Sequence, residues 1–266
     1  NGISAAIVSR IAFPLSIVST AAICAKFASI RSAILFNIIL RSVADVWLKL
    51  LNASSAAFTE DTDPLDPRID HTIGRRGIQY LDWIEHPGKD WIRAQSYAGV
   101  YSPKKFVYYK TQENSLTDGS GWTRGYATMN FNIIRFADVL LMAAEAEIEA
   151  GTLAKALEYV NLVRNRAANP AGFVMKGGVA EANYVISPYS AFADKASAQK
   201  AVRMERMLEL ATEGHRFFDL VRWGIAAKTL TPYLKYEGSI LVTMFGGATF
   251  KTGREYLPIP QAQIDI

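Results

Sequence analysis

The sequence predicts a mainly α protein in which helices are paired and long irregular loops connect them. Apolar residues recur at helical spacing through residues 132–167 and again through residues 203–224, which predicts helices in both places. Glycines and aromatic residues interrupt residues 71–128 throughout, which predicts loops there. Half of the 266 residues are apolar, and this is sufficient for a sizeable core.

Residues 1–51 differ in composition from the rest of the chain. They hold five basic residues against one acid, Asp45, and this excess equals the net charge of +4 of the whole chain. The basic pI therefore comes from this segment, and we expect no nucleic-acid partner. Residues 11–24 are similar to a signal-peptide core, and residues 34–40 are a second apolar run. Neither run reaches the roughly 20 residues of a membrane-spanning helix.

Cys24 is the single cysteine, so the chain carries no internal disulfide framework. A lipidated cysteine normally follows a small residue, whereas Cys24 follows Ile23. We interpret residues 1–51 as an atypical N-terminal segment derived from a truncated or mistranslated upstream region, and residues 52–266 as the domain proper. A genuine amphipathic helix pair in residues 1–51 is the alternative.

Residues 60–68 are predicted to form a turn, because Pro64 and Pro67 oppose a helix. The four carboxylates there suggest calcium, but the glycine and the alternating ligand spacing of a calcium loop are missing. We therefore predict no metal site and no cofactor.

The aromatic residues of residues 71–128 are the candidate ligand-binding groups. Glycine-rich loops display aromatic faces, and sugars offer flat C–H faces to such rings and hydroxyl groups to polar side chains. The alternative for each ring is that it packs inside the long loop. The candidates are Tyr80, Trp83, Trp91, Tyr97 and Tyr101.

Residues 132–150 and 153–167 are predicted to form two antiparallel helices that resemble a tetratricopeptide-type pair. Gly151 ends the first helix, and Asn169-Pro170 ends the second. The inward positions are Ile133, Ala137, Leu140, Leu141, Ala144 and Ile148 in the first helix, and Leu153, Ala156, Leu157, Val160 and Val163 in the second.

Residues 203–224 are predicted to form two helices that meet at Gly214, a residue suited to the left-handed conformation that ends a helix. The predicted buried face of the first helix is Val202, Met207, Leu208 and Ala211, and its predicted solvent face is Arg203, Glu205, Arg206 and Glu209. In the second helix Phe217, Phe218, Val221 and Trp223 supply bulk.

A catalytic interpretation of the same stretch makes His215 a general base, with Glu213 and Asp219 beside it. The alternative is a helix hairpin whose charges brace its own ends, and it is favoured because no nucleophile or metal-ligand spacing accompanies His215. We predict no catalytic residue.

The remaining segments are predicted to be connections. Residues 172–193 contain a turn at Gly177-Gly178, and residues 225–255 are irregular with a short hairpin at Gly246-Gly247. Residues 257–260 are expected to form an extended tail that packs on the helices.

Several segments together resemble the SusD/RagB family. The family signature E-R-R-x-E-L-A-x-E-G-H-R-F-F-D-L-x-R-W-G and the tail L-P-I-P-x-x-E-I are matched closely, although Met207 replaces the second arginine and Gln263 the usual glutamate. The matching positions are Glu205-Arg206, residues 209–211, residues 213–220, Arg222-Trp223-Gly224, residues 256–260 and Ile264. Asp66-Pro67-Arg68-Ile69-Asp70 also resembles a family element.

The resemblance covers about residues 58–266 and implies a SusD-like fold that is incomplete in this chain. It implies a non-enzymatic lipoprotein on the surface of the outer membrane that binds glycans or other nutrient oligomers. The implied partner is a SusC-like TonB-dependent transporter, and the implied attachment is a lipid anchor outside this chain.

Two alternatives remain. A glycoside hydrolase needs two carboxylates held several ångström apart, one with a raised pKa, and Asp82, Asp90 and Asp118 lie among the aromatic residues. A helix-pair scaffold for partner proteins needs only an exposed helical surface.

Overall fold

The computed structural model describes residues 57–58, 62–99, 101–117, 130, 132–256 and 259–264. The segment 1–51 lies outside this part. Helices predominate over strands, as the mainly α prediction requires. The helices are α5 (Ile69–Thr72), α6 (Gln95–Ala98), α7 (Phe136–Ala150), α8 (Leu153–Ala167), α9 (Lys195–Glu209), α10 (His215–Arg222), α11 (Ala226–Ile240), α12 (Val242–Phe245) and α13 (Gln261–Ile264).

The strands of the described ranges are two residues long and form three antiparallel pairs. The pairs are β1 (Ile73–Gly74) with β4 (Ser102–Pro103), β2 (Gln79–Tyr80) with β3 (Ile84–Glu85), and β5 (Met175–Lys176) with β6 (Val179–Ala180). Gly177 and Gly178 make the predicted turn between β5 and β6, and both have positive φ.

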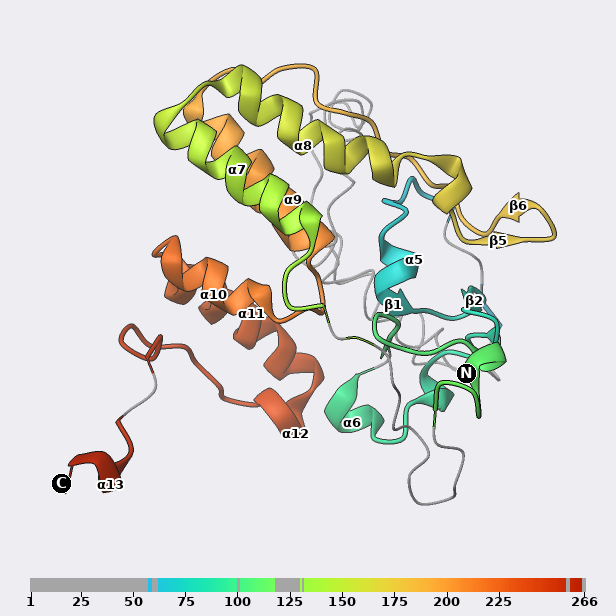
Figure 1. Ribbon diagram of the computed structural model, residues 1–266. Coiled ribbons are helices and arrows are strands. Elements are labelled where there is room, and N and C mark those ends of the chain that lie inside the picture. Colours follow the sequence, from blue (N-terminus) through green and yellow to red (C-terminus); the bar gives the residue numbers. More distant parts are fainter. Residues whose placement is uncertain are drawn as a thin grey trace, which may run out of the picture.

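Helices α7, α8 and α9 pack together and form the core (Figure 1). Ala144, Ala156 and Ala198 are fully buried at the contacts, and their small side chains allow the helices to approach closely. The larger core side chains are Leu141, Ile148, Val160, Val163 and Val202.

The predicted helix pair is confirmed with one correction. The second helix has the predicted bounds and is capped by Thr152, whose hydroxyl accepts a hydrogen bond from the Lys155 N–H at 3.2 Å. The first helix begins at Phe136 and not at residue 132, so Ile133 precedes it and is 77 % exposed. Its inward assignment was wrong.

Helix α9 corrects the predicted solvent face of the signature stretch. Glu205, Arg206 and Glu209 were predicted to face water, but they are 0–4 % exposed, and Arg203 is half-buried. Their burial is possible because each has a partner of opposite charge on another segment.

The turn between α9 and α10 also differs from the prediction. Gly214 is left-handed, with φ of +85°, but it is the residue before α10, while α9 already ends at Glu209. The bulk assigned to α10 faces outward in part, because Phe217 is 39 % and Phe218 is 70 % exposed. Leu220 is the buried apolar residue of this helix.

Residues 225–255 were wrongly predicted to be irregular. They contain α11 and α12, and Pro232 lies inside α11. Proline is strongly unfavourable in a helix interior, so helical propensity argues against α11.

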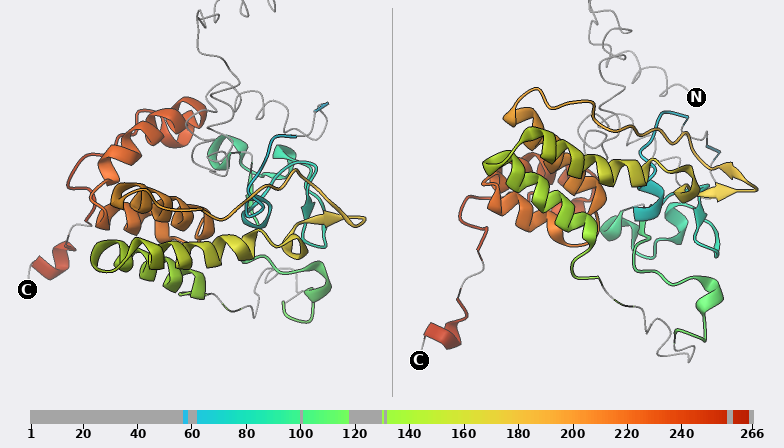
Figure 2. Two further views of the ribbon diagram at one scale, coloured as in Figure 1. Left: turned by 90° about the horizontal axis from the view of Figure 1, so that it is seen from above. Right: turned by 45° about the horizontal axis from the view of Figure 1, so that its top comes forward.

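The C-terminal tail extends away from the helices in both views of Figure 2. Leu257 and Pro258 lie outside the described residues. The described parts of the tail are exposed, with Tyr256 at 78 % and Ile259 at 68 %, so the expectation that the tail packs on the helices was wrong for them.

The loop segment 62–117 is joined to the connection between α8 and α9. Leu65 donates its N–H to the Asn183 carbonyl at 2.9 Å and accepts from the Val185 N–H at 2.8 Å. Asp70, fully buried in α5, accepts from the Tyr184 hydroxyl at 2.6 Å and from Arg75 at 2.6 and 2.8 Å. None of the helices in the described ranges has the length and apolarity needed to cross a bilayer.

Candidate functional site

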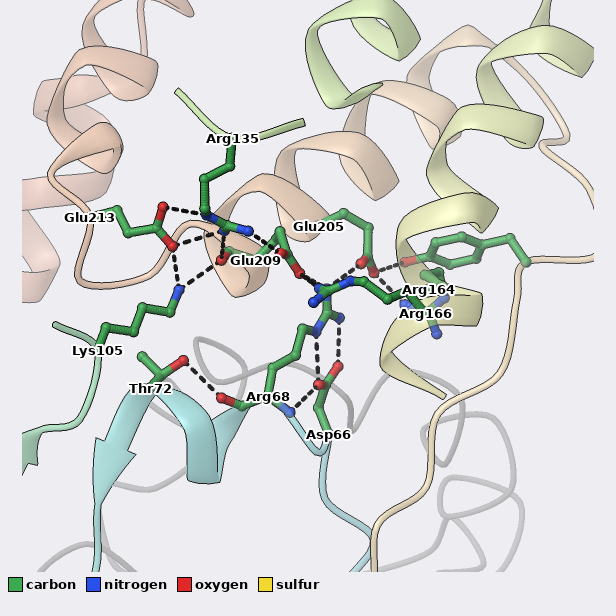
Figure 3. A network of polar contacts seen from close by, with 11 residues as sticks. Asp66, Arg68, Thr72, Lys105, Arg135, Arg164, Arg166, Glu205, Glu209 and Glu213 are labelled. Carbon is green, nitrogen blue, oxygen red and sulfur yellow. Dashed lines mark hydrogen bonds and ion pairs between the residues drawn. The ribbon is translucent and has the colours of Figure 1, made fainter. Parts of the chain in front are cut away.

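A buried ion network joins the loop segment to the helices (Figure 3). Glu205 of α9 accepts from Arg68 Nη1 at 2.9 Å and from Arg164 of α8. Arg68 also makes a bidentate pair with Asp66, at 2.9 and 2.6 Å. Burial alone would lower the pKa of Arg68, but the charges of Glu205, Asp66 and Glu209 raise it above its usual value.

Glu209 is the second centre of this network. Its carboxylate accepts from Arg135 Nη1 at 2.9 Å and from Arg166 Nη2 at 2.6 Å. Its main-chain carbonyl accepts from Arg135 at 2.9 Å and from Lys105 at 2.8 Å. The end of α9 therefore contacts three other segments through one residue.

The two carboxylates near His215 in the sequence, Glu213 and Asp219, form ion pairs with arginine and lysine side chains. These pairs test the hypothesis that His215 is a general base. Glu213 accepts from Arg135 at 2.8 Å and from Lys105 at 2.5 Å. Asp219 accepts from Arg206 and Arg222, at 2.9 Å each. Neither carboxylate orients the imidazole, so the geometry does not provide the base and orienter of that hypothesis. The charged residues of the stretch 203–224 bond mainly to other segments of the chain, and less to each other.

A cavity of about 340 Å³ lies beside the network. Its cations and acids bond to one another, so the charges that line it are largely neutralised within the protein. Its lining includes Lys105, Arg135, Arg166, Glu209 and Glu213.

An aromatic cluster forms the other candidate surface. Trp91 packs against Tyr80 and His86, with ring centroids 5.2 and 5.1 Å apart and interplanar angles of 78° and 73°. Tyr80 is 7 % exposed and donates its hydroxyl to the Pro103 carbonyl, while Trp91 remains 44 % exposed. Tyr80 therefore supports the cluster from inside, and Trp91 presents its surface.

His86 holds this cluster on the β1–β4 ladder. Its Nδ1 accepts from the Gly88 N–H at 3.0 Å, which places the ring proton on Nε2, 2.6 Å from the Ser102 hydroxyl. Burial and then the charge of Lys104 lower the pKa of His86 to about 4. The His86 ring fits here because residue 74 is a glycine: a Cβ at that position would lie 2.6 Å from the imidazole.

The other three candidates differ in how much of the side chain is exposed. Trp83 is half-buried and donates its indole N–H to the Tyr108 carbonyl at 3.0 Å. Tyr97, on α6, is 56 % exposed, and Tyr101 is half-buried. Of the five candidates, Trp91 and Tyr97 therefore offer most surface to a ligand.

The aspartates considered for hydrolysis do not form a marked pair in the described residues. Asp82 accepts the backbone N–H groups of Lys110 at 2.5 Å and Thr111 at 2.9 Å. Slight burial acts to raise its pKa, but these hydrogen bonds outweigh it and lower the pKa below the usual value. Asp90 is exposed, and Asp118 lies outside the described residues.

Sequence reasoning missed His86 and Lys104 as parts of this surface. No local pattern identifies them, because His86 meets Ser102 across 16 residues, and Lys104 meets the Gln79 carbonyl at 2.6 Å across 25 residues. The signal that was available was the aromatic and glycine content around them.

Comparisons with known proteins identify the family. The model of the SusD family matches residues 48–266. The chain is 40 % identical over 94 residues to SusD-like protein P25 of Formosa agariphila, and 33 % identical over 103 residues to SusD-like protein P38 of that organism. These matches cover 35 % and 39 % of this chain, but only 15 % and 19 % of the relatives.

A solved structure supports the fold. The crystal structure of a SusD superfamily protein from Bacteroides vulgatus superposes with a TM-score of 0.51 at 24 % sequence identity. The similarity covers 78 % of this chain and 39 % of that structure. With the family model matching most of the chain and the fold shared with this structure, the chain belongs to the SusD family.

Proposed function

We propose that the protein binds glycans or other nutrient oligomers without transforming them and passes them to a SusC-like TonB-dependent transporter. In this proposal it acts at the surface of the outer membrane, where a lipid anchor holds it. Membership of the SusD family supports the binding role and the association with such a transporter.

The observation that carries the proposal is that the Trp91 side chain is partly exposed while its ring packs against Tyr80 and His86. An exposed indole is available to the C–H face of a sugar, and the rings of Tyr80 and His86 fix its position in advance. Positioning before binding reduces the entropy lost on association. Tyr97 adds a second exposed ring in the same loop segment.

The state of Asp82 argues against the role of a glycosidase acid for this residue. A glycosidase acid must keep its proton near neutral pH, whereas the hydrogen bonds to Asp82 favour its ionised form. Asp82 organises the loop backbone around Lys110 and Thr111.

The test is glycan binding by the full chain on an array, followed by affinity electrophoresis. We expect Trp91→Ala and Tyr97→Ala to weaken binding about three- to tenfold each, the equivalent of one lost stacking contact. Tyr256→Ala is the matched control, because Tyr256 is 78 % exposed but lies in the C-terminal tail.

Three results would contradict the proposal. Equal loss in Tyr256→Ala would show that the effect is not specific to the loop. Absence of sugar affinity in a chain that unfolds cooperatively would favour the scaffold for partner proteins. Turnover of a glycan that disappears in Asp82→Asn or Asp90→Asn would favour the hydrolase.

A further inference from the structure

A second cavity, of about 250 Å³, lies between α9 and α10 on a different part of the molecule. One stripe of α9, spaced three and four residues apart, forms one wall, and Arg216, Trp223 and Ile225 form the other. The α9 stripe is Ala196, Gln199, Lys200, Arg203, Met204 and Met207.

All charged residues that line this cavity are positive. They are Lys200, Arg203 and Arg216, and among the residues that the structure describes no carboxylate lines the cavity with them. This distinguishes it from the 340 Å³ cavity, where Glu209 and Glu213 neutralise the surrounding cations.

The two arginines are held by an aromatic ring and not by acids. The guanidinium carbons of Arg203 and Arg216 lie 5.0 and 5.8 Å from the centroid of Trp223. A cation–π contact positions a guanidinium but leaves its charge uncompensated and its donors available. Within the described part of the chain, neither arginine forms an ion pair.

The nearby acids are already engaged. Asp219 bonds to Arg206 and Arg222, and Glu149 bonds to Lys195 and Gln199. Burial lowers the pKa of Arg216, and the charge of Asp219 offsets this only in part. Glu149 also interacts electrostatically with Arg203, so these acids offset part of the positive charge, and an anion in the cavity would offset the rest.

We propose that this cavity binds an oxyanion, a carboxylate or a sulfate ester, through Arg203 and Arg216. Two guanidinium groups suit an oxyanion because each presents several N–H donors in a planar fork. Met204, Met207 and Ile225 contact the carbon framework of the ligand. That this framework is a sugar, as in a uronate, rests on the proposed function, whereas anion binding itself does not.

The experiment uses the full chain and calorimetric titration at low ionic strength with sodium glucuronate, sodium sulfate and glucose. We expect glucuronate to bind more tightly than glucose and more tightly than sulfate. Arg203→Gln and Arg216→Gln should each weaken glucuronate binding at least tenfold, since each removes a charge-assisted hydrogen-bonding group.

Two further variants separate the site from general charge and folding effects. Met204→Glu places a carboxylate in the cavity while keeping both arginines, and it should abolish glucuronate binding. Arg254→Gln removes an exposed arginine of the C-terminal tail and should leave binding unchanged. The melting temperature of each unliganded variant verifies folding.

Binding of neither glucuronate nor sulfate, or glucuronate binding that is unchanged in Arg203→Gln and Arg216→Gln, would overturn the site. Sulfate binding without glucuronate binding would overturn the assignment to a sugar acid. Trp91→Ala should not affect glucuronate at this cavity. If neutral glycans do not bind at Trp91, only the proposed function is contradicted. If glucuronate does not bind at this cavity, only the present inference is contradicted.

Discussion

At the scale of single residues, the carboxylates of the signature stretch determine how the loop segment meets the helices. Glu205, Glu209 and Glu213 follow one another at intervals of four residues, and each accepts bonds from cations of other segments (Figure 3). A buried carboxylate is stable only when such partners are present. The signature therefore serves tertiary assembly more than the local stability of α9.

Glu205→Ala should lower the free energy of unfolding by about 3–5 kcal/mol, because it leaves Arg68 and Arg164 buried without this counter-charge. Urea unfolding followed by circular dichroism measures the change. The control is Glu158→Ala, which removes an exposed pair with Lys155 and should cost about 0–1 kcal/mol. Equal effects of the two substitutions would contradict the role assigned to Glu205.

His86 should make stability depend on pH. Its pKa is lowered to about 4 in the folded state, so between pH 6.5 and 4 the unfolded state binds the proton and the folded state does not. Stability from this group is fully present above pH 6.5 and is lost as the pH falls towards 4, by roughly 2–3 kcal/mol.

The imidazole protons in an NMR titration measure this directly, and those of His86 should not shift until the pH approaches 4. In His86→Gln, whose amide can still meet Ser102 and Gly88, the loss of stability between pH 6.5 and 4 should be smaller. If the free energy of unfolding of His86→Gln falls as steeply between pH 6.5 and 4 as that of the parent protein, groups other than His86 cause the loss.

At the scale of secondary-structure elements, the start of α9 depends on a capping box. The Asp194 carboxylate accepts the Ser197 N–H at 2.7 Å, and the Asp194 N–H donates to the Ser197 hydroxyl at 3.0 Å. The box begins the helix at Lys195, eight residues before the predicted hairpin region. It satisfies donors that the first turn would otherwise leave without partners.

Asp194→Ala should lower the free energy of unfolding by about 1 kcal/mol, the usual cost of a lost N-cap. Thermal unfolding measures it, with Asp194→Asn as the conservative control that retains a side-chain acceptor. A loss of several kcal/mol would indicate contacts beyond the cap, and an unchanged midpoint would mean that the box does not contribute.

Helices α7 and α8 could be predicted from sequence because their apolar positions repeat at helical spacing. Gly151 and Thr152, which end the first helix and cap the second, separate them. Helix α11 could not, because Pro232 reads as a helix breaker. The candidate site was predicted as a set of aromatic residues, but the division between Tyr80, which is buried, and Trp91, which is exposed, depends on contacts across the loop.

At the scale of the whole molecule, α7 presents an apolar stripe to solvent. The exposed fractions are 74 % for Phe136 and 43 % each for Val139 and Met142, and Ile133 lies just before them at 77 %. Exposed apolar patches of this kind favour association. The stripe lies on α7, one of the three helices that form the core.

We expect the chain to associate weakly with itself through this stripe. Phe136→Ser together with Met142→Ser should lower the average molecular mass at high protein concentration in sedimentation equilibrium. Substitution of Phe218, which is 70 % exposed on α10, is the matched control. An equal decrease in Phe218→Ser would show that association does not depend on α7.

The amino-acid sequence alone was enough to predict the mainly α class, the helix pair of residues 132–167 apart from its first four residues, the left-handed conformation of Gly214 and the family. These depend on local spacing or on a long signature. The burial of Glu205, Arg206 and Glu209, in contrast, follows only from the fold. Helical periodicity places charged residues towards water, and their partners lie far along the chain: Arg68 and Glu205 are separated by 137 residues. Two charges so far apart in the sequence form a buried ion pair only when the fold brings them together and excludes water from between them.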